Sequence, residues 1–228
     1  MLILWDIDAT LLSTSGVGQR AMEEAGQALH GPGFSARGID FAGRLDPLLM
    51  TELLIANHVS PDAASIGAFR ACYAGILARR LTPGMAIALP GVAGLLAALA
   101  HDRRITQGLL TGNFEETGLM KLQGAGLDPE LFRVRVWGDH SPHDPPAREH
   151  LPGVAIERVS ALWGRPARGE EVLVIGDTPH DIACARAHGC RALGVATGKY
   201  ARGQLAHADL AVDNLGDVEG VLRWILEH

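Results

Sequence analysis

The chain has 228 residues, of which 47% are hydrophobic and 20% are charged, and its formal net charge is −6. This length can bury an apolar core without disulfides, and it fits one large domain or a core domain with a smaller insertion. The only lysines are Lys121 and Lys199, and no long basic run occurs. Composition therefore argues against nucleic acid as a partner.

Three cysteines, Cys72, Cys184 and Cys190, match no metal-ligand spacing. Their odd number is typical of buried thiols in a reducing compartment. The chain starts with a strand-like run, and no apolar stretch is long enough to cross a bilayer. We therefore expect a cytoplasmic protein with no membrane partner, either a monomer or a homodimer.

The first third of the chain changes from a strand pattern to a helical one. An apolar run at 2–7 predicts a buried strand. Apolar residues three and four apart then predict helices at 18–29, 46–58 and 63–81, separated by glycine and proline. No strand pattern interrupts these segments, so they predict a small all-helical unit that follows the first strand.

The rest of the chain alternates between strand and helix patterns. Strands are predicted at 105–110, 134–137, 172–175, 192–195 and 210–212, and helices at 90–100, 114–123, 148–163, 181–188 and the C-terminus. Such alternation favours right-handed βαβ units and a parallel sheet. We predict an α/β fold, with a Rossmann-like doubly wound parallel sheet in a core of residues 1–15 and 87–228. Residues 16–86 would be a helical cap domain, inserted after the first strand and above the sheet edge where ligands bind.

Polar residues follow three of the predicted strands. They are Asp6 and Asp8 after the first strand, Thr111, Gly112 and Asn113 after the strand at 105–110, and Asp177 and Asp181 after the strand at 172–175. In a parallel sheet these strand ends meet, so four carboxylates should converge. Two carboxylates about 5 Å apart repel by roughly 3 kcal/mol, so the group needs protons or a cation. Oxygen ligands suit Mg²⁺, which commonly shares its shell with a substrate phosphate.

These motifs resemble those of the haloacid dehalogenase-like hydrolases. The matching patterns are Asp6-x-Asp8-x-Thr10, Thr111-Gly112-Asn113 and Gly176-Asp177-Thr178-x-x-Asp181, in the family's order, with weaker similarity at 43–46, 89–92 and 197–198. The resemblance spans nearly the whole chain. It is closest in kind to the phosphoglycolate phosphatase and phosphoglucomutase-like branch, which carries a helical cap.

The resemblance implies a reaction on a phosphate ester. Asp6 would be the nucleophile that forms an aspartyl-phosphate, and Asp8 would be the acid and base for the leaving alcohol and for water. Dehalogenases and phosphonatases of the family lack an acid at the position of Asp8, which favours phosphate esters here. Thr111, with N–H groups of Gly112 and Asn113, would bind the phosphoryl group.

The same resemblance implies a magnesium ion as cofactor. Its ligands would be Asp6, the backbone carbonyl of Asp8 and Asp177, with Asp181 completing or orienting the shell. An alternative for Asp181 is the N-cap of its helix. Arg44 in the cap is a candidate substrate contact. Its neighbour Asp46, before a proline, is equally typical of a helix N-cap.

Two positions depart from the family's pattern. The family places a lysine between the second and third motifs, but no lysine lies between Lys121 and Lys199. Arg148, at the start of a predicted helix, is the best substitute because arginine can bind phosphate with two N–H groups. Ala9 replaces a glycine, which we interpret as a variation of the loop. The histidines in the loop at 139–150 are more typical of a surface loop than of a metal site.

The sequence therefore predicts magnesium-dependent hydrolysis of a small phosphorylated metabolite. One alternative is a phosphomutase that uses the same aspartyl-phosphate. Another is a phospho-accepting signalling domain, which also carries an acidic cluster at parallel strand ends.

Overall fold

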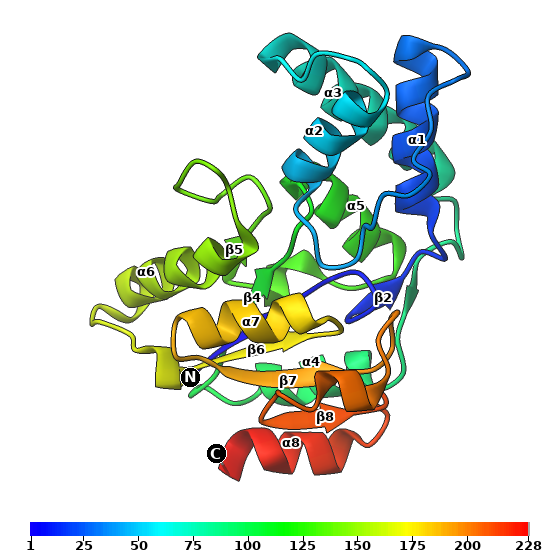
Figure 1. Cartoon of the computed structure of the whole chain (residues 1–228). Coiled ribbons are helices and arrows are strands. Elements are labelled where there is room, and N and C mark those ends of the chain that lie inside the picture. The colour runs from blue at the N-terminus through cyan, green and yellow to red at the C-terminus, as the bar shows by residue number, and fades with distance from the viewer. Residues whose placement is uncertain (228) are drawn as a thin grey trace.

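A six-stranded parallel sheet forms the centre of the computed structural model, which describes residues 1–227 (Figure 1). The strands are β1 (Leu2–Trp5), β4 (Thr106–Leu110), β5 (Val134–Val136), β6 (Val172–Gly176), β7 (Arg191–Val195) and β8 (Leu210–Val212). Their spatial order is β5-β4-β1-β6-β7-β8. The chain therefore winds outward from β1 in one direction and then in the other, which confirms the predicted doubly wound α/β fold.

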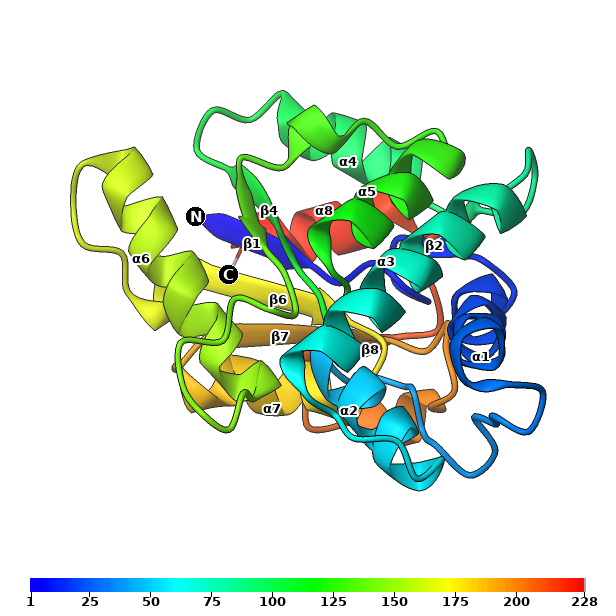
Figure 2. The ribbon, with the colours of Figure 1, turned by 90° about the horizontal axis from the view of Figure 1, so that it is seen from above.

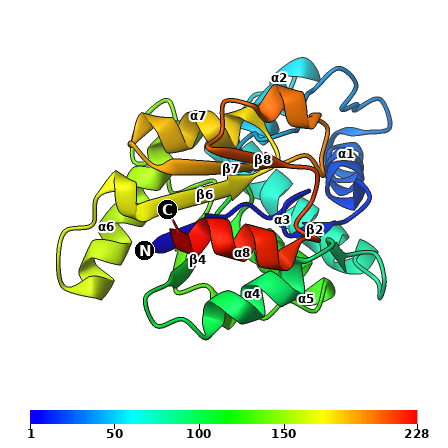
Figure 3. The ribbon, with the colours of Figure 1, turned by 90° about the horizontal axis from the view of Figure 1, so that it is seen from below.

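Helices cover both faces of this sheet. Ile3 and Trp5 of β1 pack on the side of α4 (Val92–Ala100), α5 (Glu115–Gly124) and α8 (Val218–Glu227). Leu2 and Leu4 pack on the side of α6 (Leu151–Trp163) and α7 (Pro179–Ala187). Successive residues of a strand point to opposite faces, so a strand that is buried on both sides is apolar throughout. Figures 2 and 3 show the two helical layers with the sheet between them.

Three further helices form a unit with a core of its own beside the sheet (Figure 1). They are α1 (Val17–His30), α2 (Asp46–Ala56) and α3 (Ala63–Arg80). Their buried side chains include Met22, Leu53 and Phe69, which pack with one another. No helix within residues 1–227 is long and apolar enough to span a bilayer.

The chain enters and leaves this helical unit through a short two-stranded sheet. Strand β2 (Leu12–Ser13) pairs antiparallel with β3 (Ile87–Ala88). The sequence did not predict these strands, because two residues are too few to leave an alternating pattern. The other strands and the α-helices agree with the predicted segments to within a few residues at each end.

Candidate active site

Asp6 lies directly after the central strand, where the backbone turns away from the sheet. Its N–H still donates to the carbonyl of Ile175, at 2.9 Å, so β1 and β6 hold the residue in place. The following loop closes with a hydrogen bond from the Ala9 N–H to the Leu12 carbonyl, at 2.8 Å. Ala9 has a φ of 56°. The alanine thus adopts the left-handed conformation that a glycine would favour, at a cost of about 1–2 kcal/mol.

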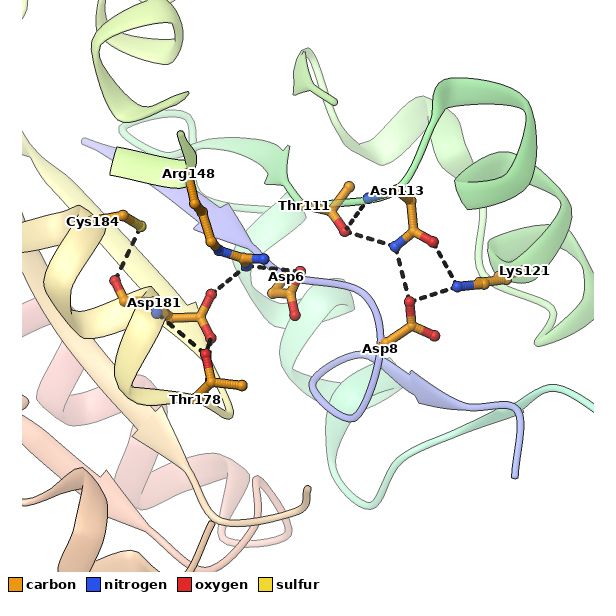
Figure 4. Close-up of polar contacts among 9 residues, drawn as sticks. All are labelled: Asp6, Asp8, Thr111, Asn113, Lys121, Arg148, Thr178, Asp181 and Cys184. Atoms are coloured by element: carbon orange, nitrogen blue, oxygen red, sulfur yellow. Dashed lines mark hydrogen bonds and ion pairs between the residues drawn. The ribbon is translucent and has the colours of Figure 1, made fainter. Parts of the chain in front are cut away.

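Arg148 lies beside Asp6 (Figure 4). A 3₁₀ turn (Arg148–His150) precedes α6 and directs the guanidinium inward. Its Nη2 is 3.1 Å from Oδ1 of Asp6 and also donates to Oδ1 of Asp181. Burial alone would lower the pKa of Arg148, but the charges of Asp181 and Asp6 outweigh it and raise the pKa. The arginine that the sequence singled out is therefore a buried, fully charged partner of two aspartates.

Asp6, Asp177 and Asp181 form a cluster of buried carboxylates at the ends of β1 and β6. One oxygen from each lies within 4.8 Å of the others, close enough to hold a metal ion. A Cβ added at Gly198 would come 1.8 Å from Oδ2 of Asp177. Only glycine leaves room for that carboxylate, which gives a reason for the glycine at 198.

Asp181 is not the N-cap of its helix, which corrects one alternative drawn from the sequence. Helix α7 begins at Pro179, and its N-cap is Thr178. The Thr178 Oγ1 accepts from the Asp181 N–H at 3.3 Å, and Oδ2 of Asp181 accepts from the Thr178 N–H at 3.0 Å. This reciprocal capping box holds one oxygen of Asp181, while the other faces Arg148.

The electrostatics of this cluster fit a divalent cation. Burial, with Asp181 and Asp8 nearby, raises the pKa of Asp6 to about 6 against the opposing effect of Arg148. Burial, with Asp181 and Asp6 nearby, raises the pKa of Asp177 to about 8. One arginine therefore does not compensate three carboxylates. A set of buried oxygen donors that lacks positive charge suits Mg²⁺.

We expect the metal-free protein to lose stability as the pH rises from 6.5 to 8.5. A carboxyl whose folded pKa is raised stabilises the fold while it is protonated, and this stability is lost as the pH passes through the folded pKa. Asp177 titrates in this window at about 8, and Asp46, whose pKa burial raises to about 7, adds to the effect. The expected loss is about 2–3 kcal/mol, or about 5–10 °C in Tm.

Thermal unfolding in EDTA across this pH range measures the effect. Added Mg²⁺ should raise Tm most at the alkaline end, because ligand carboxylates must be deprotonated to bind it. Asp177→Asn should flatten most of the pH dependence. A Tm that rises between pH 6.5 and 8.5 in EDTA would contradict the expectation.

The fourth carboxylate, that of Asp8, turns away from the other three (Figure 4). Its Oδ2 accepts hydrogen bonds from the Lys121 Nζ at 2.6 Å and from the Asn113 Nδ2 at 2.9 Å. Its side chain is 44% exposed. The sequence predicted that four carboxylates converge, but only Asp6, Asp177 and Asp181 do so, and Asp8 pairs with Lys121 instead. The sequence analysis did not identify Lys121 as a site residue. The signal for it was its position on the same face of α5 as Thr117 and Gly118, which are buried.

Thr111 and Gly112 lie between the two acidic groups and the helical unit. The Thr111 N–H donates to the Val136 carbonyl at 3.2 Å, and its Oγ1 accepts from the Asn113 Nδ2 at 2.8 Å. A Cβ added at Gly112 would lie 1.9 Å from the Arg44 carbonyl oxygen. The glycine therefore allows the segment before α2 to rest directly on the strand end.

A cavity of about 270 Å³ separates the strand ends from the helical unit. Asp6, Asp8 and Asp177 line one side of it, and Arg44 and Tyr73 line the other. Arg44 also donates to Oε2 of Glu52 at 2.7 Å. The predicted site residues of the core therefore face residues of the helical unit across the cavity.

Asp46 is not an N-cap either. Leu45 is the N-cap of α2, and Asp46 is the first helical residue. The Asp46 Oδ2 instead accepts from the Phe114 N–H, at 3.3 Å, where α5 begins. This aspartate thus stabilises a helix of the core from the opposite side of the cavity.

The histidines of the 139–150 loop satisfy one another and their neighbours. His150 Nδ1 lies 2.8 Å from Ser141 Oγ, and the rings of His143 and His150 are in edge contact. His140 Nδ1 accepts from the Trp137 N–H at 3.2 Å. Within residues 1–227, the aspartate cluster is the only group of three His, Cys, Asp or Glu side chains placed to hold a metal.

Known proteins share both the sequence pattern and the fold. A family model described as HAD-hydrolase-like matches residues 152–218. A phosphoglycolate phosphatase from Pectobacterium atrosepticum is 25% identical over 95% of this chain and 89% of its own length. Another from Chromobacterium violaceum is 29% identical, but the match covers 59% of this chain and only 56% of that protein.

Solved structures match over almost the whole length. CbbY from Rhodobacter sphaeroides, in complex with phosphate, has a TM-score of 0.76 at 21% identity and covers 95% of both chains. A hydrolase from Pseudomonas syringae has a TM-score of 0.72 at 25% identity and covers 98% of both chains. In its fold, in the segment that the family model matches and in its sequence relatives, the chain is similar to haloacid dehalogenase-like hydrolases.

Proposed function

We propose that the protein hydrolyses a small phosphate monoester through an aspartyl-phosphate on Asp6, with Mg²⁺ as cofactor. The observation that carries the proposal is the setting of Asp6. Its buried carboxylate borders the cavity, contacts Arg148 at 3.1 Å and shares a metal-sized site with Asp177 and Asp181. A nucleophilic carboxylate needs such compensation to approach an anionic phosphoryl group.

The reaction divides into two displacements at phosphorus. An oxygen of Asp6 attacks phosphorus, the bond to the ester oxygen breaks, and Asp8 gives its proton to the departing alkoxide. Asp8 then takes a proton from water, whose oxygen attacks the aspartyl-phosphate; phosphate leaves and the carboxylate of Asp6 is restored. Mg²⁺, when bound, supplies positive charge that offsets the charge on the phosphoryl oxygens.

Other residues of the site bind and orient the phosphoryl group. Thr111 offers its hydroxyl, and Gly112 and Asn113 offer backbone N–H groups from the end of β4. Arg148 would hold both Asp6 and a phosphoryl oxygen, as the family's lysine does. Asp6, Asp177, Asp181 and the carbonyl of Asp8 would hold the metal.

Residues 16–86 would act as a cap that selects the substrate and excludes water. Two features support this role. Arg70 of α3 donates to Glu116 of the core at 2.6 Å and to Asp139 at 2.9 Å, which seats the helices over the site. The cavity of about 270 Å³ suits a small metabolite rather than a phosphoprotein, and Arg44 is the candidate substrate contact.

The free thiols Cys72, Cys184 and Cys190 support a cytoplasmic enzyme.

Release of inorganic phosphate from a panel of small phosphate esters tests the proposal. We expect turnover in Mg²⁺ and its loss in EDTA, recovered when Mg²⁺ is restored. Isomerised ester without free phosphate would indicate a mutase instead. A long-lived phosphorylated protein without turnover would indicate a phospho-accepting signalling domain. No reaction with any ester, by folded protein in Mg²⁺, would contradict all three.

A further inference from the structure

Lys121 contacts Asp8 and Asn113 from a buried position on α5 (Figure 4). Its side chain is 5% exposed, and its Nζ donates to Oδ2 of Asp8 at 2.6 Å and to Oδ1 of Asn113 at 2.5 Å. The proposed phosphoryl contacts and the proposed metal site do not include this lysine. A buried ammonium is costly unless it is hydrogen-bonded, and the acceptors on Asp8 and Asn113 reduce this cost.

The lysine also determines how the Asn113 amide is oriented. An ammonium group can only donate, so the atom of Asn113 that faces it must be the carbonyl oxygen. The amide nitrogen therefore points the other way, where it donates to Oδ2 of Asp8 at 2.9 Å and to Oγ1 of Thr111 at 2.8 Å. Because Thr111 Oγ1 accepts there, its own hydrogen is free to point toward a phosphoryl oxygen.

The two oxygens of Asp8 are consequently not equivalent. Oδ2 accepts from two donors, and a proton on it would displace at least one of them. Oδ1 accepts no hydrogen bond from the described residues, and it belongs to a side chain that lines the cavity. Oδ1 is therefore the oxygen of Asp8 that is left available to a substrate in the cavity.

The surroundings of the Nζ leave little freedom for other arrangements. A Cβ at Gly18 of α1 would be 3.5 Å from Nζ and 3.6 Å from the Tyr73 hydroxyl of α3. Helix α1 therefore lies close to the lysine, and Tyr73 of α3 lies beside the same point of α1. The two residues that donate to Asp8, Lys121 and Asn113, belong to the core, and the helical unit lies over Lys121.

We propose that Lys121 is a positioning residue that holds Oδ2 of Asp8, so that Oδ1 faces the leaving oxygen and the water with which Asp8 reacts. Through Asn113 it also orients the Thr111 hydroxyl toward the phosphoryl group. This inference rests on the proposed function, because it assigns the geometry of the acid in that reaction.

The dependence of the rate on the leaving group tests the proposal. An alkyl phosphate needs a proton on its departing oxygen, whereas p-nitrophenyl phosphate leaves as a stable phenolate. With enzyme in excess of ester, we expect Lys121→Met to slow alcohol release by about 10²-fold and nitrophenolate release by less than about 10-fold. Lys121→Arg, which keeps charge and donors, should recover most of the alkyl rate. Arg104→Met, which removes an exposed cation paired with Asp102, is the matched control and should change neither rate.

The outcomes separate this inference from the proposed function. If the wild-type protein releases no alcohol from any ester, the result would contradict the proposed function itself. An active wild type in which Lys121→Met slows both esters equally, or neither, would overturn only the role of Lys121. If Lys121→Met does not fold, Asn113→Ala removes the other donor to Oδ2. It should show the same unequal loss to a smaller extent, and equal losses would again overturn the proposal.

Discussion

Asp6→Asn is expected to lower phosphate release by at least about 10⁴-fold, because the amide cannot form the acyl-phosphate. The substitution preserves the shape of the side chain. It should also stabilise the metal-free protein at pH 8: the raised pKa of Asp6, caused mainly by burial, means that the folded state disfavours its charge. Phosphate release in Mg²⁺ and thermal unfolding in EDTA measure the two effects.

The opposite signs of these effects separate chemistry from folding. A variant that is inactive because it is unfolded would lose Tm, whereas this one should gain it. Asp102→Asn makes the same chemical change at an exposed ion pair with Arg104 and should leave activity intact. Turnover by Asp6→Asn at the wild-type rate would mean that the nucleophile lies elsewhere.

Arg148→Met is expected to cost about 3–5 kcal/mol of unfolding free energy in metal-free buffer, because it leaves Asp6 and Asp181 buried without their cation. We also expect kcat/KM to fall by about 10²–10³-fold, as for the loss of an oxyanion donor. Urea unfolding and steady-state kinetics measure these losses. Mg²⁺ should recover part of the stability, since it binds only the folded cluster.

Two further variants show which property of Arg148 matters. Arg148→Lys keeps the charge and should retain more stability than Arg148→Met, while losing the second N–H contact. Arg165→Met breaks an exposed pair with Glu171 and should cost no more than about 1 kcal/mol. If Arg148→Met were as mild as Arg165→Met, the buried ion pair would not be the support that the geometry indicates.

The order and type of nearly all elements could be predicted from the sequence. Strands such as β1 and β6 are buried on both faces, so they are continuous apolar runs that end abruptly in polar residues. The helices at 46–58 and 63–81 follow a period of three to four. Strands β2 and β3 could not be predicted, because their pairing is between residues far apart in the chain and leaves no local pattern.

The candidate site was predicted in part. Motifs at successive strand ends pointed to Asp6, Asp177 and Asp181, and spacing pointed to Arg148; the structure brings these four side chains together. Their catalytic roles remain predictions. The N-cap roles suggested for Asp46 and Asp181 were wrong, because Leu45 and Thr178 occupy those positions. A cap depends on where the backbone turns, which side-chain type alone does not determine.

By itself, the sequence determined the doubly wound sheet, the inserted helices and the acidic groups at the strand ends, because strand burial and helical periodicity are local patterns. Only the tertiary structure decided that Asp6, Asp177 and Asp181 cluster together while Asp8 lies apart from them. Asp8 points away from the other carboxylates because it accepts a charge-assisted hydrogen bond from the buried Lys121. The two residues are more than a hundred positions apart in the chain. Such a pairing depends on distance in space, and no spacing along the chain records it.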